Sequence, residues 1–196
     1  MSDAALGLHH IALVVREADQ ERALYVHLAW HLLPLDEEFP ERYLMVTPDV
    51  PEPTLSMVAG WARKILRENP SGIPYGFSLP DGCFDAESGV FRGAPHRLGL
   101  TCATFVLAVF ELAGYPLANY ESWRPRPEDA VWQAHILSIL AKTRNATPQH
   151  VEAVRREAVA VRFRPSEVGG AARLSDHPAE FEQVEPVAAQ IAALIV

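Results

Sequence analysis

The sequence predicts an α+β fold, in which an antiparallel sheet packs on a helix and a mainly helical C-terminal extension follows. Three observations lead to this prediction. Residues 10–47 contain short apolar runs of strand length that are rich in β-branched residues. A longer stretch, residues 101–114, has its apolar side chains at helical spacing. Beyond Pro127 the composition shifts to helix-forming residues.

The N-terminal segment predicts three strands. Residues 10–15 form a continuous apolar run, the charged residues 16–22 predict a turn, and residues 23–33 form a second apolar run. Two such runs joined by a short polar turn are typical of an antiparallel hairpin. We expect a third strand over residues 43–47, because the proline-rich stretch 48–53 that follows is turn-forming.

Helical patterns occupy much of the remaining chain. Apolar spacing predicts a helix over residues 54–69, which Asn-Pro-Ser-Gly ends. Residues 70–100 are rich in glycine and proline and predict a loop region over a surface or a site. Residues 101–114 predict a further helix, capped by Gly114. More helical segments are expected at 128–142, 147–160 and 186–195, with a break at Gly169-Gly170.

The chain is expected to form one domain. Its 196 residues suit a single packed domain, and a composition of 49% apolar and 21% charged residues excludes a disordered or fibrous chain. We expect residues 1–125 to form the core and residues 126–196 to form a mainly helical extension packed on the same domain.

Charge and apolar patterning limit the partners and the compartment. The chain has 17 basic and 25 acidic residues, and this net charge of −8 opposes binding to nucleic acid and to anionic lipid. No apolar run approaches the ~20 residues of a membrane span, and the N-terminus lacks the basic region of a signal peptide. We therefore expect a cytoplasmic protein with no nucleic-acid or membrane partner. Nothing in the sequence indicates an oligomeric state.

Cys102 is the first candidate for chemistry, because it lies at the start of the predicted helix 101–114. Free N–H groups and the helix dipole favour an anion there, so they lower a thiol pKa and prepare a nucleophile. A packed, unreactive thiol is the alternative. The other cysteine, Cys83, is flanked by Asp81 and Asp85, which would raise its pKa and make it a poor nucleophile.

The surroundings of Cys102 resemble those in the NlpC-like papain-fold cysteine peptidases. That family carries a Gly-x-Pro-Tyr stretch, a glycine-containing loop, and Asp-Cys-Ser-Gly-Phe-Val running into a helix that ends Ala-Gly. Here Gly72-Ile-Pro-Tyr-Gly-Phe77 precedes the cysteine, and the Phe-Val pair and Ala113-Gly114 are kept. The family's Asp-Cys-Ser-Gly is replaced by Thr101-Cys-Ala-Thr104. The resemblance implies that Tyr75 lies beside the nucleophile and helps to stabilise the oxyanion.

A cysteine nucleophile of this family needs a histidine base. The downstream histidines do not begin strand patterns and are interpreted as surface or packing residues: His135, His150 and His177. Upstream, residues 10–15 resemble the family's base-bearing strand, and residues 24–28 resemble the strand that follows it. The order His, His, Cys is that of the circularly permuted branch, which includes lecithin:retinol acyltransferase-like proteins. The resemblance implies that His10 is the general base and that His27 orients it, with thiolate and imidazolium as the resting pair.

Two choices among the histidines stay open. Neighbouring strand residues point to opposite faces, so only one of His9 and His10 can face the cysteine. His10 is preferred because the small Ala12 follows it at the position of the family's glycine. His27 and His31 would share one face of an unbroken strand. His27 fits the motif better, and His31 is the reserve.

These features predict a cysteine hydrolase of the amidase or peptidase type, which acts through a thioester on Cys102. The substrate is expected to be a small-molecule or peptide amide, and no cofactor or metal is implied. An alcohol or amine acceptor in place of water would make the protein an acyltransferase. The first alternative is a papain-fold domain without catalysis that acts as a binding or interaction module.

A second alternative starts from the same N-terminal histidines. His9-His-Ile-Ala-Leu-Val-Val also resembles the start of the vicinal-oxygen-chelate metalloenzymes, in which His10 would be a metal ligand. That fold requires a second βαβββ module, and the helical second half of the chain does not predict one.

Two other features each have a default interpretation and an alternative. Trp123 and Trp132 are expected in the core, and the alternative is that they line a groove. The basic cluster Arg155, Arg156, Arg162 and Arg164 is expected on a solvated helix face, and the alternative is carboxylate recognition.

Overall fold

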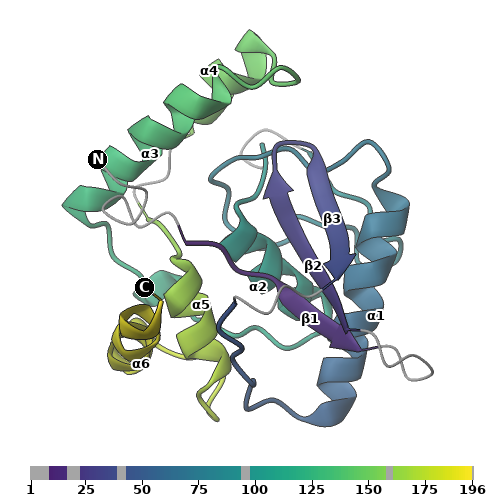
Figure 1. The fold of residues 1–196 in the computed structure, drawn as a ribbon, viewed down its shortest axis with the longest axis vertical. Coiled ribbons are helices and arrows are strands. Elements are labelled where there is room, and N and C mark those ends of the chain that lie inside the picture. The colour runs from purple at the N-terminus through teal and green to yellow at the C-terminus, as the bar shows by residue number, and fades with distance from the viewer. Residues whose placement is uncertain (1–8, 17–22, 39–42, 94–97, 158–160, 196) are drawn as a thin grey trace.

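The computed structural model describes residues 9–16, 23–38, 43–93, 98–157 and 161–195. In these residues the fold is α+β, with a three-stranded antiparallel sheet and six α-helices, most of them in the C-terminal half (Figure 1). The expected fold class is therefore confirmed at the level of an α+β arrangement with an antiparallel sheet and a mainly helical C-terminal part.

The sheet has the order β1-β2-β3, with β1 at Leu13–Arg16, β2 at Ala23–Trp30 and β3 at Leu33–Glu38. The antiparallel pairing of β1 with β2 confirms the predicted hairpin. The predicted third strand is wrong, because residues 43–47 form no strand. The third strand instead follows β2 after a two-residue turn, which Leu32 closes with a φ of 56°. Its last residues are Asp-Glu-Glu, so no apolar alternation marks the strand in the sequence.

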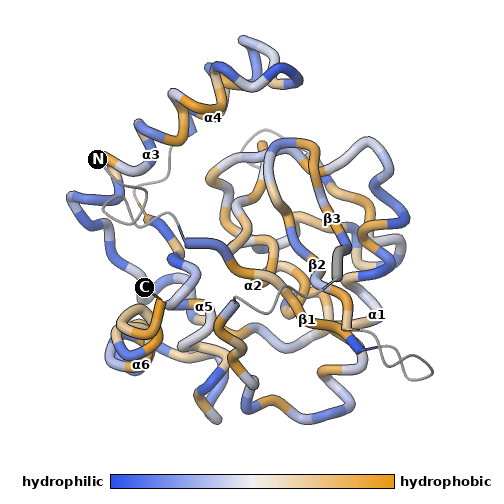
Figure 2. The backbone as a smooth tube through the Cα atoms, viewed as in Figure 1, coloured by the Kyte–Doolittle hydropathy of each residue, from blue (hydrophilic) through white to orange (hydrophobic). Residues whose placement is uncertain are grey.

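The predicted helices over 54–69 and 101–114 are present as α1 (Glu52–Glu68) and α2 (Cys102–Leu112). Helix α2 is apolar on all sides, with every residue from 103 to 110 buried, as expected for a helix at the centre of a fold. It packs against β2, α1 and α5. Figure 2 shows apolar positions gathered around α2 and the neighbouring part of the sheet. This central position fixes the first residue of α2, Cys102, against the sheet.

The C-terminal half contains α3 (Pro127–Leu140), α4 (Pro148–Arg156), α5 (Pro165–Ala172) and α6 (Phe181–Leu194). The predicted chain break at Gly169-Gly170 is wrong, because both glycines lie inside α5. A Cβ built on Gly170 would lie 3.1 Å from the Ala188 nitrogen of α6, so the missing side chain lets the two helices approach closely. Gly170 therefore allows α5 and α6 to pack closely, and it does not mark a turn of the chain.

The four C-terminal helices pack in two different places. Buried residues of α5 and α6 belong to the main core, which also contains β1, β2, α1 and α2. Helices α3 and α4, which lie apart from α5 and α6 in Figure 1, form a second cluster with Tyr75 and Phe77. The loop region around Tyr75 therefore lies between the sheet and the α3–α4 pair. Within the described parts of the chain, no helix combines the length and the apolar character needed to cross a membrane.

Candidate active site

Cys102 is the first residue of α2, and two threonines build the start of this helix. The Thr101 hydroxyl accepts a hydrogen bond from the Thr104 backbone N–H at 3.1 Å, and the Thr101 N–H donates to the Thr104 hydroxyl at 2.8 Å. This reciprocal capping box satisfies N–H groups that a helix start leaves free. Thr101 and Thr104 cap the helix and so hold Cys102 at its N-terminus.

Cys102 is partly exposed as a residue and lines a pocket of about 190 Å³. The backbone N–H groups of Ile11 and Ala103 lie close enough to the thiol to favour its ionised form. The pocket is lined by residues from the segment before β1, from β2, from the loop region between α1 and α2 that contains Tyr75, from α2 and α3, and from the segment that leads into α5. Its polar lining includes His9, His10, Tyr75, Cys102 and Arg162.

His10 and His27 form a pair at this site. The Nε2 atom of His10 lies 2.7 Å from the Nδ1 atom of His27, and the two rings meet edge to face. The buried ring of Tyr25 packs on His27 with a centroid separation of 4.5 Å. The structure therefore places the two predicted histidines in contact. The backbone of Ile11, the residue after His10, is near enough to Cys102 to affect the pKa of its thiol. The catalytic roles of His10 and His27 stay predictions.

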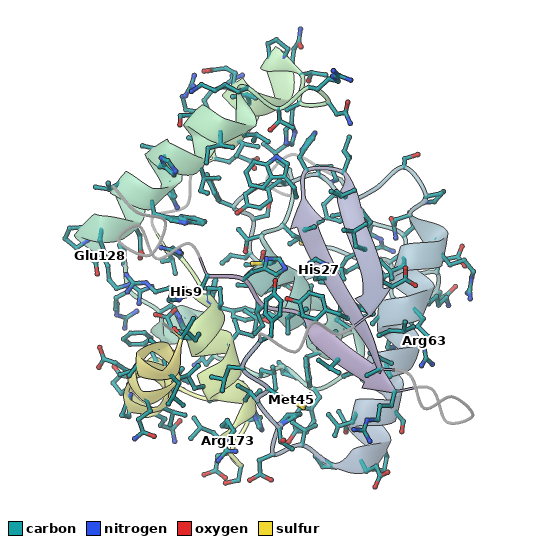
Figure 3. All side chains as sticks on the ribbon, in the orientation of Figure 1. His9, His27, Met45, Arg63, Glu128 and Arg173 are labelled. Atoms are coloured by element: carbon teal, nitrogen blue, oxygen red, sulfur yellow. The ribbon has the colours of Figure 1, made fainter. Side chains whose placement is uncertain are left out.

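Both His9 and His10 line the pocket, which the alternation argument did not predict. Residues 9–12 precede β1, so strand alternation does not apply to them. In Figure 3, His27 lies on β2 near the centre of the molecule, and His9 lies on the segment that leads into β1. His10 differs from His9 in that its ring contacts His27.

His31, the reserve candidate, has a different position. Its Nδ1 accepts a hydrogen bond from the Tyr75 backbone N–H at 3.2 Å. His150 of α4 binds the other side of the same residue, with its Nε2 2.9 Å from the Tyr75 carbonyl oxygen. The His31 and His150 rings lie 4.7 Å apart. This pair holds the Tyr75 backbone, so His150 is a support of the site that the sequence analysis had assigned to the surface or to packing.

Tyr75 is buried and lines the pocket, as the resemblance implied. Its ring packs on Trp30 with a centroid separation of 4.4 Å. Burial, and after it the nearby Cys102, raise the pKa of the Tyr75 hydroxyl far above its ordinary value. The hydroxyl is therefore protonated throughout the neutral range, and it is a hydrogen-bond donor beside the cysteine.

The protonation of Cys102 and His10 differs from the predicted ion pair. Burial raises the pKa of the Cys102 thiol, although the Ile11 and Ala103 N–H groups and the Arg162 charge oppose this rise. Burial, and then the neighbouring His27, lower the pKa of His10 to about 4. At neutral pH a neutral thiol and a neutral imidazole are therefore favoured. Desolvation outweighs the helix N-terminus on which the prediction of a thiolate depended.

Arg162 is the residue of the site that the sequence analysis missed. It was expected on a solvated helix face, but it is 8% exposed and precedes α5. Its guanidinium lies over the Trp132 ring, 3.9 Å from the ring centroid. Burial lowers the pKa of Arg162 to about 10, so it keeps its charge at neutral pH. Arg155 and Arg156 of α4 are exposed, as expected.

The described residues contain no group of three or more His, Cys, Asp or Glu side chains that could hold a metal ion. Within these residues the metalloenzyme alternative therefore lacks three side chains that could bind one metal ion together. Comparison of the chain with models of protein families, with curated proteins and with solved structures found no match.

Proposed function

We propose that the protein is a cysteine hydrolase of the papain-like, permuted NlpC type, acting on amides through a thioester on Cys102. One observation carries the proposal. The helix-opening cysteine, His10 and Tyr75 line one pocket although they come from distant parts of the chain, and His27 contacts His10. Nucleophile, base, orienting group and oxyanion donor are the parts that acyl transfer by a thiol requires.

His10 is the base in this proposal, and its hydrogen bond to His27 determines which ring nitrogen of His10 can accept a proton. When His10 Nε2–H donates to His27 Nδ1, the Nδ1 atom of His10 is unprotonated. This atom takes the proton of the Cys102 thiol as the sulfur attacks the carbonyl carbon of the amide. Because thiol and imidazole are both neutral at rest, the proton moves during the attack and not before it.

The remaining steps follow the same groups. The carbonyl oxygen becomes an oxyanion, which the Tyr75 hydroxyl and the Cys102 N–H stabilise. The tetrahedral intermediate collapses to a thioester as the C–N bond breaks, and His10 gives its proton to the leaving amine. Water then attacks the thioester while His10 accepts a proton. The acid is released, and the proton returns to the Cys102 sulfur.

Trapping of the acyl-enzyme tests this proposal directly. We expect p-nitrophenyl acetate to acetylate wild-type protein at Cys102, to be seen by peptide mass spectrometry, and to be turned over. In His10→Ala the acetylation rate is expected to fall by about 10²- to 10⁴-fold, the usual contribution of a general base. His9→Ala is the matched control and should retain the wild-type rate. An equal acetylation rate in wild type and His10→Ala would support the non-catalytic binding module instead.

The pH dependence of kcat/KM provides a separate prediction. His10 acts as a base only when it is unprotonated, and its pKa is lowered from 6.5 to about 4. We therefore expect kcat/KM for p-nitrophenyl acetate to keep its value as the pH falls from neutrality to about 5, and to decline as the pH approaches 4. Circular dichroism at each pH shows whether the fold is intact. An acid limb centred near 6.5 would contradict the burial of His10.

A further inference from the structure

The pocket at Cys102 is positively charged in a chain whose net charge is −8. Among the described residues that line it, none is an aspartate or a glutamate. The lining side chain that is cationic throughout the neutral range is Arg162. His10 is neutral there, because its pKa is lowered to about 4. The charge of the pocket is therefore opposite in sign to that of the whole protein.

The position of Arg162 makes this charge effective at the reacting atoms. The guanidinium is stacked on Trp132, a geometry that fixes the plane of the arginine and removes water from one of its faces. Its charge acts on both neighbours, since it opposes the rise in the pKa of Cys102 and of Tyr75. In a buried site a charge acts more strongly than in water.

Asp129 and Glu167, whose negative charges act on Arg162, also bind other groups. Asp129 accepts hydrogen bonds from Arg126 at 2.9 Å and from Arg164 at 3.1 Å. Glu167 is ion-paired with Arg126 and accepts from the Trp123 indole N–H. Their negative charge is thus distributed over several donors, and both carboxylates lie outside the pocket lining.

Trp132 supplies a second, independent observation. It lines the pocket and is 7% exposed, and its indole N–H is buried without a hydrogen-bond acceptor among the described residues. The N–H itself is buried and is not exposed to the pocket, and the Trp132 ring forms an apolar wall behind the Arg162 guanidinium. Trp30 and Phe163 form further apolar walls. An anion bound beside Arg162 therefore lies in apolar surroundings, where the positive charge is poorly screened.

We propose that Arg162 binds a carboxylate of the substrate, so that the enzyme selects amides with a carboxylate close to the scissile bond. This inference rests on the proposed function and names its substrate class. The planar guanidinium matches a planar carboxylate. A carboxylate is favoured over a phosphate because one fixed positive charge neutralises a monoanion and leaves a phosphate dianion uncompensated. The pocket of about 190 Å³ suits a short carboxylate-bearing group.

Two alkylating reagents that differ in charge test the proposal without a known substrate. Iodoacetate carries a carboxylate and iodoacetamide is neutral, and both alkylate thiols. The rates at Cys102 are followed by peptide mass spectrometry at mildly alkaline pH. We expect the iodoacetate-to-iodoacetamide rate ratio to exceed that of the free thiol N-acetylcysteine amide by about tenfold or more. Arg162→Gln is expected to reduce the ratio to that of the free thiol, and Arg162→Lys to retain most of it.

Arg155→Gln is the matched control, because Arg155 is exposed on α4, pairs with Glu152 and lies outside the pocket lining, so the ratio should not change. A wild-type ratio in Arg162→Gln, or a free-thiol ratio in the wild type, would overturn the proposal. The absence of labelling by either reagent would do the same, since a pocket closed to a two-carbon acid cannot receive a substrate carboxylate.

Protection of the wild-type protein keeps the test independent of variant folding. We expect propionate to slow the labelling of Cys102 by iodoacetamide, and propionamide and inorganic phosphate not to slow it. Equal protection by the acid and the amide would refute carboxylate binding, and equal protection by phosphate would refute the choice of a carboxylate. Because alkylation needs no turnover, these outcomes are distinguishable from a failure of the acyl-enzyme experiment, which concerns His10.

Discussion

Replacement of Cys102 by alanine is expected to lower the turnover of p-nitrophenyl acetate by about 10⁴-fold or more, to the rate of the background reaction, because no other group in the pocket replaces the nucleophile. The fold should be intact. Cys102 is partly accessible, and the capping box that begins α2 is made by Thr101 and Thr104. We expect the free energy of unfolding to change by less than about 1 kcal/mol. Steady-state kinetics and urea unfolding measure the two quantities.

Cys83→Ala is the matched control, and it should give the opposite result. Cys83 is buried in the main core, and its thiol donates to the Leu79 carbonyl at 3.0 Å. Its loss is expected to cost about 1 kcal/mol of stability and to leave turnover unchanged. Wild-type turnover in Cys102→Ala, or loss of turnover in Cys83→Ala alone, would refute the assignment of the nucleophile.

Gly99→Ala is expected to damage both stability and activity, because two backbone segments cross at this residue. A Cβ on Gly99 would clash with the Pro74 carbonyl oxygen and would lie 2.6 Å from the Tyr75 carbonyl carbon. These segments are joined by the bond from Leu100 N–H to Pro74 O at 3.0 Å, two residues before Cys102. We expect a loss of about 1–3 kcal/mol from overpacking. Displacement of Tyr75 is expected to lower kcat by about 10²-fold.

The control for this change is Gly60→Ala, in the middle of α1. A Cβ at Gly60 meets no atom within 4 Å, so alanine should raise stability by about 0.5–1 kcal/mol and leave kcat unchanged. Thermal unfolding and steady-state kinetics on the two variants separate the effects. Wild-type stability and activity in Gly99→Ala would show that the two segments can separate without consequence for the site.

The fold was predictable where local pattern and tertiary role agree. The β1–β2 hairpin and the helices α1 and α2 follow from apolar periodicity in the sequence. Strand β3 was not predictable, because its pairing with β2 depends on a tight turn at Leu32 and its last residues are acidic. The helical Gly169-Gly170 pair was missed for a similar reason, since the close approach of α6 that requires Gly170 is a tertiary contact.

For the site, short motifs predicted which residues meet, and burial decided their electrostatics. The structure places Cys102, His10 and Tyr75 around one pocket and joins His10 to His27. Desolvation determines the charge states of Cys102 and His10, and for this reason the expected thiolate is not favoured. Desolvation depends on tertiary burial, which no local sequence pattern indicates. Arg162 was missed because it belongs to a cluster of arginines in the sequence with Arg155, Arg156 and Arg164, and only the packing on Trp132 distinguishes it.

The pocket is lined both by His10, near the start of the sequence, and by Arg162, about 150 residues later. During synthesis, which starts at the N-terminus, Cys102 leaves the ribosome before the segment that contains Arg162 has been made. Contacts between residues so distant in sequence form late in folding, after the cost of closing long loops has been met. The thiol should therefore acquire its anion-binding neighbour only when synthesis of the α5 region is complete, so the nascent protein carries no finished site.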